Sequence, residues 1–192
     1  MYRKILGATA AAALLVGGSV AIGSPASAAP LVPVAGVTTL IANIPTVESL
    51  VHHNVSAYSL EPGGSWVKTT DKPGAWEVAL PVTGLEKSKR LTHLGGVIFA
   101  HMCHVDPHVA LYAPTINLVK AKISADVYLN GEPLGRKNIF SISGGTATPT
   151  GFDNVKVKFI EGIPTFLNTE LCTSAFWEGQ RFGKANVEVV PL

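Results

Sequence analysis

The sequence has only two cysteines, few charged residues and no run of Lys or Arg. Two cysteines cannot hold a chain of this length together without a hydrophobic core. The absence of a basic run argues against nucleic acid or an anionic membrane as the main partner. Beyond the first residues, no stretch is long and apolar enough to cross a bilayer.

What is present at the amino terminus is the pattern of a secretory signal. Arg3 and Lys4 precede an Ala-, Leu- and Val-rich run, and Ala26, Ser27 and Ala28 form a small-residue cleavage pattern. We predict that residues 1–28 are removed, and the alternative is a retained membrane anchor. The mature protein is then secreted or held at the cell wall, with no membrane span.

Removal of this signal changes the charge balance. The chain has 15 Lys and Arg residues, and loss of Arg3 and Lys4 leaves 13 basic residues against 13 acidic ones. The mature chain is therefore neutral, and its length of about 160 residues suits one domain with its own core.

The mature chain is predicted to begin with an extended apolar arm, residues 29–46, because several prolines punctuate it. This arm either lies along its own domain as an edge strand or is donated as a strand to a partner. Residues 47–192 then form the folded domain.

This domain contains many short segments with β-strand patterns. Residues 65–70 and 76–82 alternate around a turn at residues 71–74, and Asn130-Gly131 is a strong hairpin signal. Residues 83–90 are polar and are predicted to form a loop. One helix is expected from residue 163 to about residue 173, with Pro164 in its first turn.

Short strands at regular spacing predict an all-β fold, an immunoglobulin-like antiparallel β-sandwich with this one helix in its carboxyl-terminal half. In an exported chain, Cys103 and Cys172 are expected to form one disulfide. The alternative is a reactive thiol or a metal ligand.

Residues 91–127 are the stretch around which the rest is predicted to be organised, since they hold four of the six histidines. His101, His104, Asp106 and His108 lie close together in sequence. A turn at Asp106-Pro107 could gather His104, Asp106 and His108 around a transition metal such as zinc or copper. The alternative is a set of surface histidines that bind nothing.

Evidence for an enzyme is lacking. The chain has no Gly-x-Ser-x-Gly, no His-Glu-x-x-His and no phosphate-binding glycine loop. Gly95-Gly96 is instead expected to serve a turn or a close backbone approach. Trp66, Trp76 and Trp177 could stack against a sugar, although packing is the more ordinary role of tryptophan in a small β domain.

Several motifs carry a family resemblance. They are Gly-Val-Ile-Phe at residues 96–99 followed by His101, Ala-Pro-Thr-Ile-Asn-Leu at 113–118, the Ala-containing strand 121–127 and the closing run 163–189. Over residues 91–189 the chain resembles the HtaA-type domain of actinobacterial secreted and cell-wall proteins. That resemblance implies a β-sandwich that captures haem, with a tyrosine as iron ligand and a supporting histidine.

Only His101 corresponds to this family by motif, and Tyr58 is the nearest candidate tyrosine. We therefore expect a secreted, non-enzymatic binding module. It would hold haem or a metal at a face containing Tyr58, His101, His104, His108 and His52 or its neighbour His53. Imidazole and phenolate are iron ligands. The alternative is a subunit that docks on another secreted or cell-surface protein through residues 30–45.

Overall fold

The structure is a computed structural model that describes residues 31–32, 34–61, 66–69, 76–86, 89–101 and 107–191. The predicted signal peptide lies outside the described residues. In chain order the elements are β1 (Leu31–Val32), β2 (Val34–Ala42), α1 (Ile44–His52), β3 (Val55–Leu60), β4 (Trp66–Thr69), β5 (Trp76–Glu86), β6 (Arg90–His93), β7 (Gly96–His101), β8 (His108–Asn117), β9 (Lys122–Leu129), β10 (Glu132–Ser143), β11 (Thr146–Thr148), β12 (Gly151–Phe159), α2 (Ile163–Glu170) and β13 (Arg181–Pro191).

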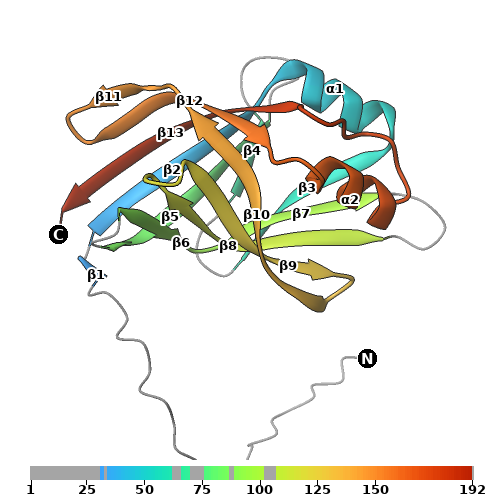
Figure 1. Ribbon diagram of the computed structural model, residues 1–192, viewed down its shortest axis with the longest axis horizontal. Helices are drawn as coiled ribbons and strands as arrows, with labels where there is room; N and C mark the ends of the chain where they lie inside the picture. Colours follow the sequence, from blue (N-terminus) through green and yellow to red (C-terminus); the bar gives the residue numbers. More distant parts are fainter. Residues whose placement is uncertain are drawn as a thin grey trace, which may run out of the picture.

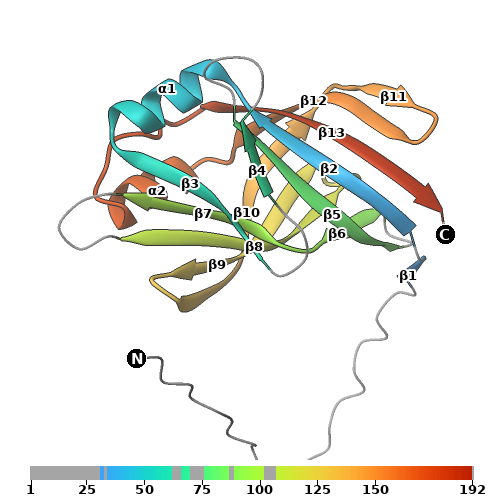
Figure 2. The same ribbon diagram turned by 180° about the vertical axis from the view of Figure 1, so that it is seen from behind.

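Eight strands close into an antiparallel barrel (Figures 1 and 2). Around the barrel they follow chain order: β2, β5, β6, β8, β9, β10, β12 and β13, and β13 pairs with β2 to complete the circle. The short strand β6 joins β5 to the second half of β8. The first half of β8 pairs with β7, which pairs with β3. These two strands extend the barrel wall.

The predicted immunoglobulin-like sandwich is therefore wrong. Alternation of apolar and polar residues is the same in a sandwich and in a barrel, because both bury one face of each strand. A sandwich and a barrel differ in which strands, distant in sequence, pair with one another. Residues 83–90 were predicted to be a loop, but residues 83–86 end β5 and Arg90 begins β6, which closes the wall.

Close packing of the strands depends on glycine at four described strand positions, Gly36, Gly96, Gly151 and Gly183. A Cβ atom on Gly96 would overlap the carbonyl oxygen of Leu111 in β8, and one on Gly183 would overlap that of Ile41 in β2. The expectation of a close backbone approach at Gly96 is confirmed. Glycines of this kind let strands bend and approach where a barrel curves.

Both helices lie at the same end of the barrel, while β1 and the carboxyl terminus lie at the other (Figures 1 and 2). The helices bury Leu50 of α1 and Leu167 of α2 in the barrel core. The helix predicted near residue 163 is confirmed as α2. Helix α1 was not predicted. It begins after Asn43, whose side-chain oxygen accepts a hydrogen bond from the Thr46 N–H at 2.9 Å, and Pro45 occupies its first turn.

The predictions of individual strands and turns were more accurate than the prediction of the overall architecture. The hairpin at residues 65–82 appears as β4 paired with β5, and Asn130-Gly131 joins β9 to β10. The predicted arm contains β1 and β2. Strand β2 pairs with β13 on one side and β5 on the other, so it is an interior member of the wall.

Candidate functional site

An apolar cavity lies inside the barrel. Its walls come from every barrel strand except β12, together with β3 and β7. About 60 Å³ are open to the centres of water molecules, which is room for several waters or a small apolar group. The side chains that line it are aliphatic or aromatic apart from Thr38 and His93.

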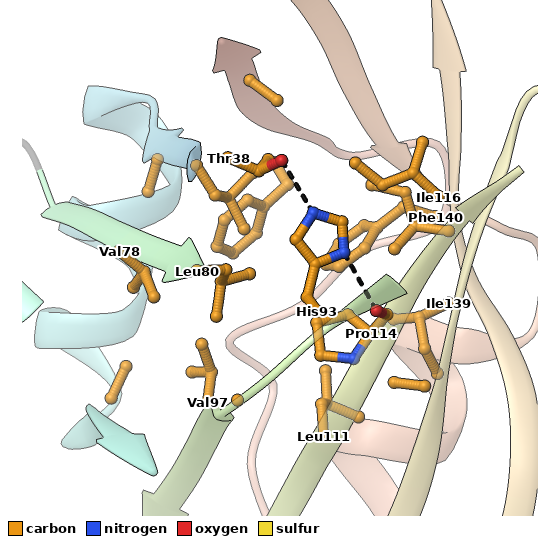
Figure 3. A pocket seen from close by; sticks show the side chains of 18 of the residues that line it. Thr38, Val78, Leu80, His93, Val97, Leu111, Pro114, Ile116, Ile139 and Phe140 are labelled. Atoms are coloured by element: carbon orange, nitrogen blue, oxygen red, sulfur yellow. Dashed lines mark hydrogen bonds between the residues drawn. The ribbon is translucent and has the colours of Figure 1, made fainter. Parts of the chain in front are cut away.

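Thr38 and His93 form a buried hydrogen-bonded pair in this cavity (Figure 3). Thr38 on β2 is 3% exposed and His93 on β6 is 4% exposed. Thr38 Oγ1 lies 2.8 Å from His93 Nε2, and His93 Nδ1 lies 3.0 Å from the carbonyl oxygen of Pro114. Both ring nitrogens are therefore bonded, as buried polar atoms must be.

The Pro114 carbonyl reaches His93 because β8 is irregular at this point. The pairing of β8 with β9 shifts between Tyr112 and Thr115, and Ala113 has a φ of 46°. Such a bulge turns one backbone group away from the ladder. Here it leaves the Pro114 carbonyl as an acceptor inside the barrel.

A side chain from β10 holds this bulge from the outside. Arg136 donates hydrogen bonds to the Ala113 carbonyl oxygen at 3.0 Å and to the Thr115 hydroxyl. The same guanidinium lies 3.1 Å from a carboxylate oxygen of Asp126 on β9. Arg136 thus ties three neighbouring strands together beside the bulge.

These contacts fix the protonation of His93. Burial lowers the pKa of His93 to about 4, against the smaller opposing effects of backbone hydrogen bonds to Pro114 and Leu91. The ring is therefore neutral at pH 7. A carbonyl oxygen only accepts, so Nδ1 carries the proton, and the unprotonated Nε2 accepts from the Thr38 hydroxyl.

A second cavity adjoins the first at the end of the barrel away from the helices. About 250 Å³ are open to the centres of water molecules there. The two cavities share Ile116, Ile123 and Ala185 as lining residues. Phe152 of β12, which is 36% exposed, lines the outer one. The outer cavity therefore lies next to the inner one, with these three residues in the walls of both.

The predicted haem ligands do not meet at this cavity. Tyr58 on β3 is 51% exposed and pairs with Ile98 on β7. Because side chains alternate along a strand, His101 faces the opposite side of the β3–β7 ladder. Its Nδ1 lies 2.7 Å from the carbonyl oxygen of Leu171, just after α2.

The other predicted ligands are also dispersed. His52 is exposed at the end of α1, where its ring meets that of His53 edge to face at a centroid distance of 5.0 Å. His108 begins β8, and its backbone N–H donates to Asn130. His104 and Asp106 lie outside the described residues. Within the described ranges, no three His, Cys, Asp or Glu side chains gather to hold a metal ion.

The expected disulfide is likewise wrong. Cys172 is a free, exposed cysteine directly after α2 and its cap, and Cys103 lies outside the described residues. The tryptophans do not form a shared platform among the described side chains. Trp76 lines the inner cavity, Trp177 is 45% exposed, and the Trp66 side chain lies outside the described residues.

Sequence reasoning overlooked Thr38 and His93, although a signal for His93 was present. Leu91 and His93 are two residues apart and so share a face of β6, and Leu91 is buried. Period-two spacing therefore placed His93 on the inward face. Thr38 carried no comparable signal, because an isolated threonine in an apolar strand is common.

No family model, curated protein or solved structure matches the chain. The resemblance to the HtaA-type domain stays a prediction, while the sandwich that it implied is replaced by the barrel. In the part of the chain that the structure describes, no helix has the length and apolar character needed to cross a membrane.

Proposed function

We propose that the protein is a secreted, non-enzymatic binding module that holds a small apolar molecule inside its barrel. The observation that carries this proposal is the inner cavity, whose walls are apolar except for one neutral, hydrogen-bonded pair. Ligand sites of small barrels are concave, mostly apolar and provided with few polar groups. The signal-peptide pattern of residues 1–28 supports the assignment to an exported protein.

The described contacts favour this function over docking through the amino-terminal arm. Strand β2 occupies most of that arm and already pairs with β13 and β5. A strand that is paired on both sides offers no free edge for a partner strand.

Calorimetric titration of the mature protein with n-octanol tests the proposal. Binding should be saturable, and Ala125→Ile should weaken it by at least about tenfold, because Ala125 lines the cavity and the larger side chain fills it. Ala110→Ile is the matched control, since Ala110 on β8 lies between the inward-facing Val109 and Leu111 and so points outward.

Two outcomes would count against the proposal. One is the absence of saturable binding in the unaltered protein. The other is equal weakening by Ala125→Ile and Ala110→Ile, because octanol would then bind somewhere other than the cavity. Circular dichroism of both variants establishes that the barrel is still folded.

A further inference from the structure

The hydrogen bonds inside the cavity determine which donors and acceptors remain for a ligand. His93 uses its only proton, on Nδ1, to bond Pro114, and its Nε2 accepts from the Thr38 hydroxyl. Both donors of the pair are therefore occupied. What remains is the acceptor capacity of Thr38 Oγ1, because a hydroxyl oxygen has two lone pairs. Among the described residues, His93 is its one recorded partner.

No other lining residue supplies a donor at Thr38: Ser143, whose hydroxyl can donate, lines the outer cavity and not the inner one. Neither cavity is lined by a charged side chain. Trp76, whose indole N–H is a donor, begins β5, whereas His93 pairs with Val82 well along that strand. A carbonyl or ether oxygen placed beside Thr38 would thus find no free donor, and a carboxylate would find no cation.

We infer that the ligand is a neutral, elongated apolar molecule that donates one hydrogen bond to the Thr38–His93 pair, as an alcohol does. This inference rests on the proposed function. The hydroxyl would lie at Thr38, and the apolar body would extend toward Ile116 and Ile123, which line both cavities. An incoming O–H satisfies the remaining acceptor without disturbing the bond from His93 to Pro114.

Two probes of equal heavy-atom count test the inference: n-octanol, which donates and accepts, and heptyl methyl ether, which only accepts. Burial of apolar surface alone favours the ether, because its oxygen has no hydroxyl proton to desolvate. We expect octanol to bind about fivefold more tightly, as one neutral hydrogen bond provides. Equal or tighter binding of the ether would overturn the inference and leave the proposed function standing. Failure of both probes to bind would contradict the proposed function itself.

Two variants then locate the preference. Thr38→Val removes the hydroxyl but leaves His93 Nε2 as a bare acceptor facing the cavity, so octanol should still be preferred. His93→Leu releases the Thr38 hydroxyl to donate, so the ether becomes an acceptable partner and the two affinities should become equal within about twofold.

The opposite pattern would overturn the inference, namely loss of the preference in Thr38→Val and its retention in His93→Leu. If His93→Leu does not fold, the ratio of the two affinities in the unaltered protein and in Thr38→Val decides the matter. Thr38→Val is nearly isosteric and keeps a β-branched side chain in β2.

Discussion

His93 differs from the exposed His52 and the half-buried His101 in what surrounds it. His93 sits among apolar side chains with both ring nitrogens bonded, and burial holds its pKa near 4. His52 is exposed at the end of a helix, and His101 bonds a backbone carbonyl near the barrel end. Because His101 and its neighbours cluster in the sequence, they were predicted to form the site. The surroundings make His93 the better candidate for a ligand contact.

The largest expected effect concerns pH. His93 has a pKa of about 4 when folded and an ordinary value of 6.5, so the unfolded chain binds more protons between these values. Its contribution to the free energy of unfolding is complete above pH 6.5 and is lost as the pH falls toward 4. The loss amounts to about 3 kcal/mol. Urea unfolding at several pH values measures it.

His93→Gln and His52→Gln form the matched pair for this measurement, because carboxylates also affect unfolding at low pH. The slope of stability against pH between 4 and 6.5 should be shallower in His93→Gln than in the unaltered protein and unchanged in His52→Gln. Identical slopes in all three proteins would mean that His93 is not kept neutral by burial.

Thr38→Val should lower the free energy of unfolding by about 1–2 kcal/mol, because it leaves the buried Nε2 of His93 without a donor. In the double variant with His93→Leu, the cost of losing the Thr38 hydroxyl should be smaller, since no unpaired nitrogen remains. A double-mutant cycle from urea unfolding measures this coupling. Strict additivity of the two substitutions would show that the pair does not interact.

Arg136→Met should lower the free energy of unfolding by about 1 kcal/mol, because the bulge of β8 loses its bonds to the guanidinium. Lys122→Met, an exposed substitution on β9, serves as the comparison and should be nearly neutral. Thermal unfolding of the two variants suffices. If both behave alike, the guanidinium does not support the bulge.

The smallest effect is expected at the surface. His52→Ala should change the free energy of unfolding by no more than about 0.5 kcal/mol, as exposed substitutions usually do. Its affinity for n-octanol should equal that of the unaltered protein. Weaker octanol binding in this variant would bring His52 back into the ligand site.

The sequence predicted the local structure well, but it did not predict that the strands close into a barrel. The β4–β5 hairpin, the turn at Asn130-Gly131 and the start of α2 follow from turn residues and local spacing. Closure depends on β6, a strand of four residues that joins β5 to β8, and nothing in Arg90–His93 specifies those distant partners. Register between such strands is fixed by tertiary packing.

The candidate site was missed for a related reason. Thr38 and His93 are 55 residues apart in sequence and meet only because β2, β5 and β6 are consecutive strands of the wall. The Pro114 carbonyl enters the barrel through a bulge at Ala113, a residue type that gives no warning of a positive φ. Sequence proximity favoured His101 and His108 instead.

The most direct test of an internal ligand site is a nuclear magnetic resonance titration with n-octanol of protein labelled at its Ile, Leu and Val methyl groups. Saturable shifts should be confined to methyl groups that line the cavities, such as those of Leu111, Ile116 and Ile139. The exposed Val51 and Val119 should not respond. Shifts at Val51 and Val119 with none at the cavity residues would contradict the account, because octanol would then bind the surface and leave the barrel interior empty.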